Sequence, residues 1–314
     1  MKSHSKTVPI AVALHGGSGT ILRQNLSEEL ENEYRHALAT ALDIAWNILE
    51  NGGSALDAVE KGACSLEDCP LFNAGAGSVL TAEGIHELDA SIMFGKDRNA
   101  GAVTGIRTVR NPISLARAAM EKSSFVFLGG DGAEQFADTT NLERVPEDWF
   151  TTKERADQLK EAQQRDTAVM DHDGTPNKFG TIGVVALDLN GDLASATSTG
   201  GLTNKQFGRI GDSPVIGAGT YADNMTCAIS CTGYGEEFIR AVVAHDVASR
   251  MRYLGESLEQ AAHEIVHVQL PKIDGCGGLV GVDCKGNVTL PFNTDGMYRA
   301  WRSSLHGEGV EIFK

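Results

Sequence analysis

Two threonines on an apolar hairpin are the residues of this sequence best placed for chemistry. The run Thr181 to Asp188 is almost continuously apolar, as expected of a strand covered on both faces. Asn190-Gly191 separates it from a second run, 192–198, and Asn-Gly between two such runs is a strong hairpin signal. A two-residue loop makes the numbers of facing residues sum to 381, so that Thr181 faces Gly200 and Thr199 lies beside it, within roughly 5–8 Å. We therefore expect two hydroxyls to meet at the end of a buried hairpin.

The residues before Thr181 suggest how its hydroxyl is activated. A threonine hydroxyl is a poor nucleophile unless a base lies within hydrogen-bond reach. If the chain is cut between Gly180 and Thr181, the freed α-amine of Thr181 becomes that base, because its pKa of about 7.7–8 is close to working pH. Gly180 offers little hindrance to attack on its own carbonyl, and the unpatterned turn formers at 171–179 predict a mobile loop before it. The pattern predicts an autocatalytic cut that exposes an N-terminal nucleophile.

The first half of the chain alternates strand and helix patterns that would position this site. A buried strand is expected at Ile10 to Leu14, ending in a turn at His15-Gly16-Gly17. Helix starts are indicated by Ser27, which caps a helix running to Asn51, by Ser54 with Asp57, and by Pro112. The pattern predicts further elements, namely a helix from Ser54 to Asp68 and strands at 86–94 and 102–109.

The second half begins with a polar segment and returns to buried strands. Residues 152–165 predict a charged helix, and 151–180 as a whole reads as a mobile linker. A second hairpin is expected around Lys285-Gly286-Asn287, and helices at 236–252 and 257–269. Sheets that need cover on both faces, with helices in both halves, predict an α/β fold, a four-layer αββα sandwich. We expect a single domain, 1–314, cut into an alpha subunit, 1–180, and a beta subunit, 181–314.

Composition excludes several classes of partner. A net charge of −15 argues against nucleic acid and anionic membranes, because both attract a basic face. No stretch approaches the ~20 apolar residues of a membrane span, and the polar N-terminus lacks a signal-peptide core. The six cysteines contain no Cys-x-x-Cys pair and are expected to be buried thiols in a reducing compartment. These features predict a cytoplasmic protein.

Several blocks of the sequence together carry a family resemblance. Gly-Thr-Ile-Gly-Val-Val-Ala-Leu-Asp (180–188) is followed by Ala-Thr-Ser-Thr-Gly-Gly (196–201), Gly-Arg-Ile-Gly-Asp-Ser-Pro (208–214) and Gly-Ala-Gly-Thr-Tyr-Ala-Asp-Asn (217–224). The chain closely resembles the plant-type asparaginase and isoaspartyl peptidase family, a branch of the N-terminal-nucleophile hydrolases. The likeness extends over nearly the whole chain, through blocks at 15–19, 69–75, 87–90 and 231–236. It implies a threonine-nucleophile amidohydrolase that acts on L-asparagine and β-aspartyl dipeptides, without a preference readable from the motifs.

The resemblance also implies a role for each matching residue. Thr181 would be the nucleophile and Thr199 would hold its amine and hydroxyl. Arg209 would bind the substrate α-carboxylate, for which a planar guanidinium is suited, and Asp212 its α-ammonium. The other implied site residues are Thr232 and the Gly233 N–H as oxyanion hole, Gly235 against the substrate, and Asn73 near the nucleophile.

A cofactor and an assembly follow from the same resemblance. No cofactor is expected for catalysis. A structural sodium ion is implied, wrapped by oxygen ligands, which suit a hard cation. Its ligands would be the backbone carbonyls of Leu66, Glu67, Cys69, Phe72, Ala74 and Ala76. The cut subunits would assemble as a dimer of alpha-beta heterodimers.

Two other classes of function have some support in the sequence. His263-Glu-Ile-Val-His267 matches the His-Glu-x-x-His pattern of zinc proteases. On a helical wheel both histidines fall opposite the apolar line through Leu258, Ala262, Ile265 and Gln269, and Pro271 closes the helix without a third ligand. A phosphate-binding module could use Gly16-Gly17 or Gly129-Gly130, but neither has P-loop or dinucleotide-binding spacing. The amidohydrolase interpretation is therefore preferred.

Overall fold

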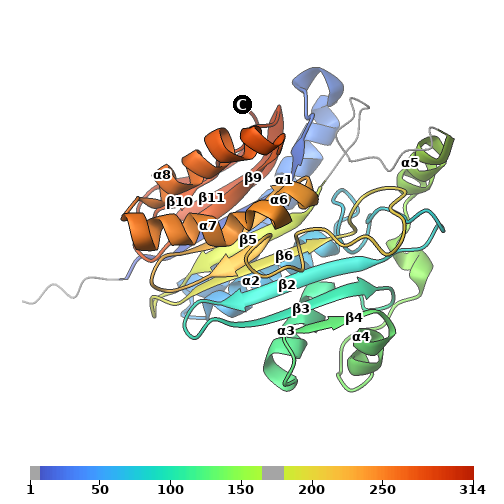
Figure 1. Cartoon of the computed structure of the whole chain (residues 1–314), viewed down its shortest axis with the longest axis horizontal. Coiled ribbons are helices and arrows are strands. Elements are labelled where there is room, and N and C mark those ends of the chain that lie inside the picture. Colours follow the sequence, from blue (N-terminus) through green and yellow to red (C-terminus); the bar gives the residue numbers. More distant parts are fainter. Residues whose placement is uncertain (1–7, 165–179) are drawn as a thin grey trace, which may run out of the picture.

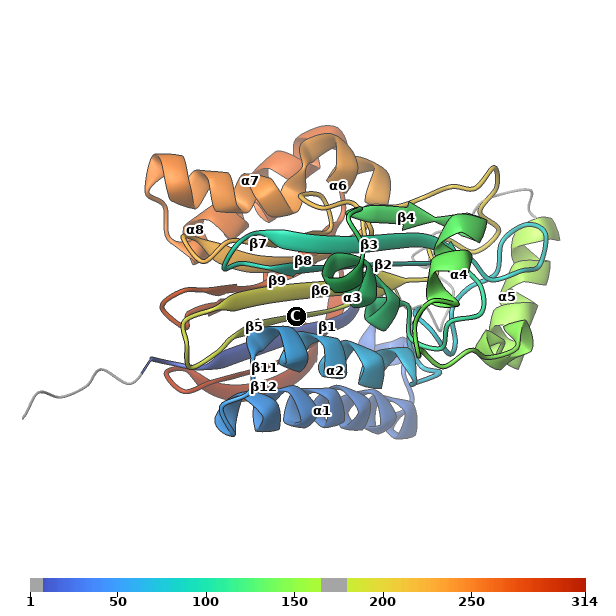
Figure 2. The same cartoon turned by 90° about the horizontal axis from the view of Figure 1, so that it is seen from below.

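Four layers stack in the order helices, sheet, sheet, helices (Figures 1 and 2), in a computed structural model that describes residues 8–164 and 180–314. The predicted αββα sandwich is confirmed. The larger sheet has eight strands in the order β12 (Gly307–Phe313), β11 (Gly296–Ser303), β1 (Ala11–Gly19), β5 (Ile182–Leu187), β6 (Leu193–Thr199), β2 (Leu88–Phe94), β3 (Asn99–Ile106), β4 (Phe127–Gly129). The smaller sheet has four, in the order β10 (Val288–Thr289), β9 (Gly277–Asp283), β8 (Cys227–Gly233), β7 (Thr220–Ala222).

Helices cover the outer faces of the two sheets (Figure 2). The larger sheet is covered by α1 (Glu28–Glu50), α2 (Ala55–Glu67) and α3 (Pro112–Lys122). The smaller sheet is covered by α6 (Gly235–Ala241), α7 (Val243–Ser249) and α8 (Leu258–His263), with wider or tighter helical turns η3 (Arg250–Leu254), η4 (Glu264–Gln269) and η5 (Leu270–Ile273). The remaining helical elements are η1 (Arg23–Asn25), α4 (Gly130–Ala137), η2 (Glu147–Phe150) and α5 (Lys153–Gln164).

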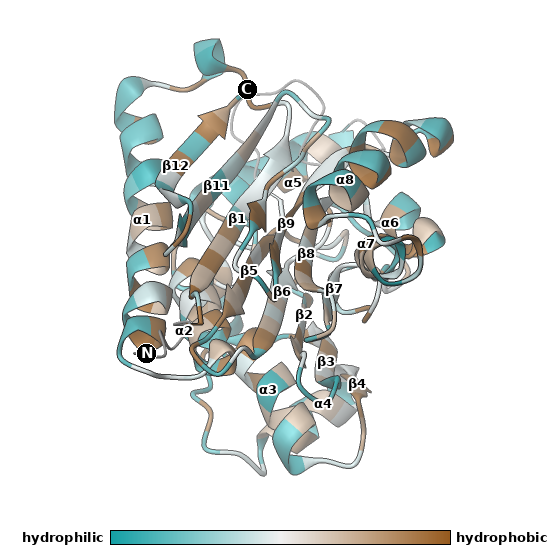
Figure 3. Ribbon diagram, turned by 90° about the vertical axis from the view of Figure 1, so that its left-hand side faces the viewer, coloured by the Kyte–Doolittle hydropathy of each residue, from teal (hydrophilic) through white to brown (hydrophobic). Residues whose placement is uncertain are grey.

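Alternation along the central strands divides the apolar side chains between two cores. In β1, Val12 and Leu14 pack under the α1–α3 layer, while Ala11 and Ala13 lie on the side of the second sheet. The residues of β5 alternate in the same way, which explains why both strands read as continuous apolar runs. Figure 3 shows hydrophilic residues on much of α1 and α8, at the outside of the sandwich.

Three helix starts follow the capping chemistry read from the sequence. Ser27 Oγ accepts a hydrogen bond from the backbone N–H of Leu30, and α1 runs from Glu28 to Glu50. Ser54 caps α2 by accepting from the N–H of Asp57, and Pro112 occupies the first turn of α3. These three predictions are confirmed. The strands β2 and β3 and helix α5 begin or end within two to three residues of their predicted positions.

The β5–β6 hairpin has a register one residue away from the prediction. Its loop contains three residues, with the Gly191 N–H donating to the Asp188 carbonyl at 3.0 Å and Gly191 at φ +80°. This is the three-residue loop in which a left-handed glycine follows a tight turn. Ile182 therefore pairs with Ser198, and the next pair outward is Thr181 with Thr199. The second hairpin, joining β9 to β10 around Gly286, is confirmed.

The turn expected after Leu14 is wrong, because β1 continues to Gly19. Its backbone groups are satisfied by β11, which pairs Ser18 with Met297 beyond an irregularity between His15 and Ser18. Gly17 lies inside that bulge at φ +110°, a conformation that favours glycine. The glycines thus reshape a strand near the site instead of ending it.

The helix expected at 236–252 is interrupted at Val242, which adopts φ +50°. Beyond it, the backbone N–H groups of Ala244 and His245 donate to the carbonyls of Ala218 and Gly217 at 3.1 and 2.8 Å. A neighbouring loop thus takes the place of the preceding helical turn. The helix expected at 257–269 starts at its Ser257 cap as predicted, but it widens into η4 and passes through Pro271 into η5.

The polar segment and the cysteines depart partly from expectation. Helix α5 buries Arg155, Leu159 and Ala162, and the loop expected at 171–179 lies outside the described residues. All six cysteines are free, yet Cys284 is exposed, so the expectation of uniformly buried thiols is wrong. Among the described residues, no helix combines the length and the apolar character that crossing a membrane requires.

Candidate active site

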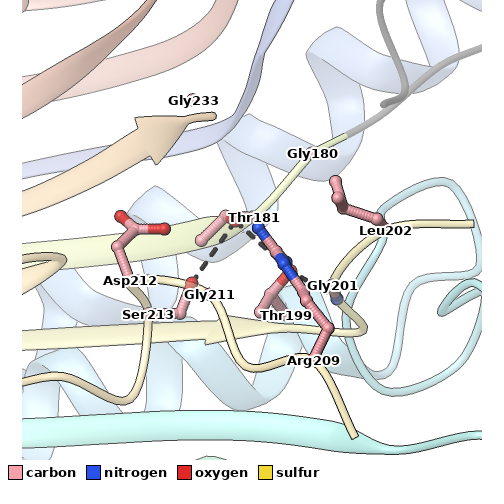
Figure 4. Close-up of a pocket in the computed structure, with 10 residues that line it drawn as sticks. All are labelled: Gly180, Thr181, Thr199, Gly201, Leu202, Arg209, Gly211, Asp212, Ser213 and Gly233. Carbon is pink, nitrogen blue, oxygen red and sulfur yellow. Dashed lines mark hydrogen bonds between the residues drawn. The ribbon is translucent and has the colours of Figure 1, made fainter. Parts of the chain in front are cut away.

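A small polar pocket opens where the ends of β5 and β6 meet the loop 200–213 (Figure 4). The sequence predicted part of this set, because six of the lining residues had been given roles. The pocket is lined by Gly180, Thr181, Thr199, Gly201, Leu202, Arg209, Gly211, Asp212, Ser213 and Gly233.

Thr181 stands at the floor of this pocket, immediately before β5. Its Oγ1 lies 3.3 Å from the Oγ1 of Thr199 and 3.4 Å from the Oγ of Ser213 (Figure 4). Thr199 Oγ1 also accepts the N–H of Gly201 at 3.0 Å, which fixes its orientation. Thr181 is only 7% exposed, so the hydroxyl lies at the protein–solvent boundary within a cluster of other hydroxyls. Donors and acceptors of this kind can hold and polarise a nucleophile.

The peptide bond before Thr181 begins at a glycine, Gly180, and packs against the strand bulge of β1.

 
A Cβ on Gly17 would lie 2.5 Å from the Gly180 nitrogen, so the bulge and the segment before Thr181 are in direct contact. A Cβ on Gly180 would lie 3.3 Å from Thr232 Oγ1. The absence of both side chains allows three segments to pack around this peptide.

The two residues expected at the oxyanion hole are placed at the end of β8. Gly233 lines the pocket, whereas Thr232 lies on the side of Gly180. Thr232 Oγ1 accepts the backbone N–H of Ser18 at 3.2 Å, and its carbonyl accepts the Ser18 hydroxyl at 3.1 Å. Because Ser18 supplies the donor in the first bond, the proton of the Thr232 hydroxyl remains available to another acceptor.

Arg209 lines the pocket but already has a carboxylate partner. Its Nε and Nη2 donate to the two carboxylate oxygens of Glu236 at 3.0 and 2.7 Å. This bidentate pair orients the guanidinium plane, and the pairing raises the pKa of Arg209 against the opposing effect of its burial. A second carboxylate would therefore meet a preoriented guanidinium that is shared with Glu236.

Asp212 is buried on the pocket wall, and one of its oxygens, Oδ2, has no hydrogen-bond partner among the described residues. Burial raises the pKa of this carboxyl to about 7, although the nearby Arg209 acts in the opposite direction. A buried carboxylate with an unpaired oxygen is costly, and a bound cation would relieve that cost. Asp212 thus has the character of a cation-binding group.

Gly235 and Asn73 support the pocket without lining it. A Cβ on Gly235 would lie 2.9 Å from Arg209 Nη2 and 3.0 Å from Asp212 Oδ1, so this glycine packs behind the two charged residues. The Asn73 side chain donates to the Gly201 carbonyl at 2.8 Å, and its backbone carbonyl accepts the Gly200 N–H at 3.1 Å. Asn73 thereby fixes the turn that follows Thr199.

The carbonyls expected around sodium belong to the end of α2 and the buried turn after it. The Glu67 carbonyl accepts the Ala76 N–H at 2.7 Å, which closes this turn. Gly75 and Gly77 adopt φ +52° and +87°, and a Cβ on Gly75 would lie 2.3 Å from the Glu67 oxygen. The turn is thus a tight backbone cradle that only glycine can complete, and oxygen donors of this type fit a hard monovalent cation.

The His-Glu-x-x-His motif does not form a metal site in the described residues. His263 and His267 are both exposed, with ring centroids 4.7 Å apart, as the helical wheel predicted. On the opposite line Leu258, Ala262 and Ile265 are buried, and Gln269 is half-buried. In the described parts of the chain no group of three or more His, Cys, Asp or Glu side chains could hold a metal ion.

Removal of zinc and other divalent metals should leave activity unchanged. We expect EDTA to have no effect on amide hydrolysis, and the double variant His263→Ala/His267→Ala to act about as well as the wild type, because neither ring reaches the pocket. The rate of ammonia or aspartate release before and after chelation measures this. A loss of activity that added zinc restores would instead revive the metalloprotease interpretation.

Several residues at the site had no predicted role. Ser213 lies within the block that carries Arg209 and Asp212, and its contact with Thr181 is visible only in three dimensions. His15 and Ser18 belong to the block 15–19, and Glu236 ends the block 231–236. Both blocks were used for the family resemblance, without a role for these three side chains. Each is separated from its partner by more than 25 residues in the sequence. Motif identity was the only signal available for them.

Comparisons with known proteins identify the relatives of this chain. The family model described as Asparaginase matches residues 8–310. The isoaspartyl peptidase of Escherichia coli (strain K12) is 50% identical, with 92% of each chain covered. A probable isoaspartyl peptidase/L-asparaginase 2 of Arabidopsis thaliana is 42% identical over 92% of this chain and 94% of its own. The isoaspartyl peptidase/L-asparaginase of Mus musculus is 41% identical over 97% of this chain and 92% of its own.

Proposed function

The chain belongs to the asparaginase family, and from that membership we propose that it is a threonine-nucleophile hydrolase of L-asparagine and β-aspartyl dipeptides. Both substrates contain an L-aspartyl unit with a side-chain amide and would release L-aspartate. We propose further that the chain cuts itself before Thr181 to become active.

One observation carries most of this proposal. The Thr181 hydroxyl stands at hydrogen-bond distance from Thr199 and Ser213 in a pocket whose wall supplies Arg209 and Asp212. Thr181, its two hydroxyl partners and two side chains of opposite charge thus line one pocket, which supports the proposed roles. No metal or organic cofactor is required for such acyl transfer.

The proposed self-cleavage begins with attack of Thr181 Oγ1 on the Gly180 carbonyl carbon. The C–N bond breaks, an ester joins Gly180 to the Thr181 oxygen, and the proton of the hydroxyl passes to the departing α-amine. Water then hydrolyses the ester. Gly180 lines the pocket beside Thr181, so the reacting groups are neighbours before any movement.

In the cut enzyme the α-amine of Thr181 would act as general base. It takes the hydroxyl proton while Oγ1 attacks the side-chain carbonyl of the substrate, and then passes the proton to the leaving amine. The developing oxyanion would be held by the Gly233 N–H and the free proton of the Thr232 hydroxyl. Water hydrolyses the resulting aspartyl ester and restores Thr181.

The charged wall of the pocket would select the aspartyl head group. The free α-carboxylate pairs with Arg209, which Glu236 already holds in orientation. The α-ammonium pairs with the orphaned oxygen of Asp212. The α-ammonium loses water on binding, but it gives the buried Asp212 carboxylate a partner. This gain makes the contact favourable.

Binding of the product L-aspartate should depend on pH through Asp212. Burial holds its pKa at about 7 in the free enzyme, so this carboxyl is increasingly protonated as the pH falls below that value. Only the ionised form attracts the α-ammonium, so the inhibition constant of L-aspartate should rise by about tenfold per pH unit below about 7. Competitive inhibition measured across this range, with Asp212→Asn as reference, tests the assignment. A constant inhibition constant would contradict it.

A structural sodium ion is part of the proposal. The backbone carbonyls of the turn after α2 would hold it, and the left-handed glycines Gly75 and Gly77 support this by giving the turn its tight curvature. Such an ion supplies charge that organises carbonyl dipoles and does not take part in bond making. The turn bears on the site through Asn73, which contacts Gly200 and Gly201.

Two further expectations remain proposals. We infer a cytoplasmic location from the composition and the free cysteines, and a dimer of alpha-beta heterodimers from the family resemblance. A small polar substrate is supported by the pocket residues, and the net charge of −15 gives no basis for a nucleic-acid partner.

The direct test of the function is an assay of the purified protein. Mass measurement under denaturing conditions establishes whether the chain ends at Gly180 and begins again at Thr181. L-aspartate release is then followed from L-asparagine and from β-aspartyl-leucine. A fully cut protein that releases no aspartate from either compound would refute the proposed function.

A further inference from the structure

A histidine without an assigned role lies directly behind the nucleophile. His15 is fully buried in β1, on the side of the second sheet, and pairs with Gly183 of β5. A Cβ on Gly183 would lie 2.5 Å from His15 Nε2 and 1.8 Å from Ser230 Oγ. The missing side chain at 183 thus leaves the space that the imidazole occupies between the two sheets.

The hydrogen bonds of His15 fix its tautomer. Nδ1 lies 3.0 Å from the carbonyl oxygen of Thr181, and Nε2 lies 3.0 Å from Ser230 Oγ. Burial lowers the pKa of this imidazole to about 3, so the ring is neutral and carries one proton. A carbonyl oxygen only accepts, so the proton is on Nδ1, and Nε2 accepts the hydroxyl proton of Ser230. The ring therefore donates toward the nucleophile's own backbone.

Thr181 depends on this contact because no pairing of β5 with the described strands reaches its carbonyl. Pairing of β5 with β1 ends at His15 opposite Gly183, and pairing with β6 ends at Ile182 opposite Ser198. Thr181 therefore lies just outside the last residue pair of each ladder. Once the bond to Gly180 is cut, Thr181 becomes a chain end, and the bond from His15 to its carbonyl restrains its backbone.

We propose that His15 is a positioning residue for catalysis. By holding the Thr181 carbonyl through Nδ1–H, it fixes rotation about the Cα–C bond and so the places of the α-amine and Oγ1. Both groups must lie within reach of each other and of the substrate carbonyl, and a misplacement of about 1 Å can lower a rate by roughly 10²-fold. This inference rests on the proposed function, since it assigns His15 to the same site.

A buried histidine could also serve only the stability of the core, and the chain offers a matched control. His86 is buried too, bonds Ser78 Oγ at 3.0 Å and Thr151 Oγ1 at 2.8 Å, and has its pKa lowered by burial to about 4. Within the described residues, the side chain of His86 forms no hydrogen bond with a residue that lines the pocket. Substitution of His86 should cost stability and leave turnover unchanged.

The two amide analogues of histidine separate the two ring contacts. Asn places an amide donor near the position of Nδ1, whereas Gln reaches the position of Nε2. We expect His15→Asn to retain kcat within about tenfold of the wild type, and His15→Gln to lose roughly 10²-fold in kcat. KM for β-aspartyl-leucine should change little in either, because Arg209 and Asp212 hold the head group. His86→Gln should match the wild type in both constants.

The measurement is kcat per exposed Thr181, with the cut fraction of each variant determined by mass and its stability by thermal unfolding. Wild-type activity must be shown first, and its absence would count against the proposed function and not against His15. Equal kcat in the Asn and Gln variants, or an effect on KM alone, would overturn the positioning role.

The tautomer itself can be read without a variant of His15. In the wild-type enzyme, ring 15N shifts should reveal an imidazole that stays neutral from about pH 5 to about pH 8 with its proton on Nδ1. His86→Gln removes the resonance of the other ring that is buried among the described residues and so helps to assign that of His15. A proton found on Nε2 would overturn the inference even if neither His15 variant folds.

Discussion

Thr181→Ala should remain a single uncut chain and should lose activity by about 10⁴-fold or more, because both the nucleophile and the amine exposed by cleavage disappear together. The wild type should separate under denaturing conditions into fragments 1–180 and 181–314. The geometric reason is that Thr181 Oγ1 is held by Thr199 and Ser213 beside Gly180. Mass spectrometry of the two purified proteins measures the outcome.

Two controls sharpen this experiment. Thr226→Ala removes a threonine that is also buried, in the turn between β7 and β8 and away from the pocket, and this variant should be cut and active like the wild type. Thr181→Ser keeps a hydroxyl and should be cut, though more slowly. Cleavage of Thr181→Ala at the same bond would show that another agent makes the cut.

Arg209→Ala should lower kcat/KM for β-aspartyl-leucine by roughly 10²-fold while leaving self-cleavage intact. The substrate α-carboxylate loses its guanidinium, whereas Glu236, whose side chain is 38% exposed, can turn to solvent when its bidentate partner is removed. Self-cleavage is spared because the Gly180–Thr181 bond carries no free carboxylate. Steady-state kinetics and the cut fraction give the two readouts.

The same charge pair predicts which linkage the wild type accepts. In α-aspartyl-leucine the α-carboxyl is part of the peptide bond, so Arg209 would gain no carboxylate, and only the β-linked isomer should be hydrolysed. Arg250→Ala is the matched control, because Arg250 forms a similar bidentate pair with Glu256 at 2.7 Å outside the pocket. Comparable hydrolysis of the α- and β-linked dipeptides would contradict the assignment of Arg209 and Asp212.

Local sequence signals identified most elements, because caps and apolar alternation act over a few residues. Ser27, Ser54 and Pro112 begin helices through contacts with their own next turn, so their roles are legible in the sequence. The interruption at Val242 is different. It depends on the carbonyls of Gly217 and Ala218, which approach from another part of the chain and give no local signal.

The hairpin shows how much a single residue of register matters to the site. A two-residue loop at Asn190-Gly191 would have turned Thr199 to the opposite face from Thr181. The three-residue loop places the two threonines directly across from each other on one face, at 3.3 Å between hydroxyl oxygens. The two loops share the same Asn-Gly signal, so loop length could not be settled from it.

The charges of the pocket were predicted as residues but not as a network. Arg209 and Asp212 were identified through their shared motif, yet the partner that orients Arg209 comes from the start of α6. The unpaired oxygen of Asp212 and its raised pKa arise from burial, which depends on how the loop 200–213 folds over the sheet. Such long-range environments set the properties of the site and are invisible in a linear motif.

The strand order of the larger sheet has a consequence for the proposed two-chain enzyme. From one edge, β12 and β11 come from the second fragment, β1 from the first, β5 and β6 from the second, and β2, β3 and β4 from the first. The two polypeptides are therefore interleaved along three seams, and neither could keep its part of the sheet alone. Cleavage would turn a unimolecular unfolding reaction into a dissociation, so that the melting temperature of the mature protein should acquire a dependence on its concentration that the uncut precursor lacks.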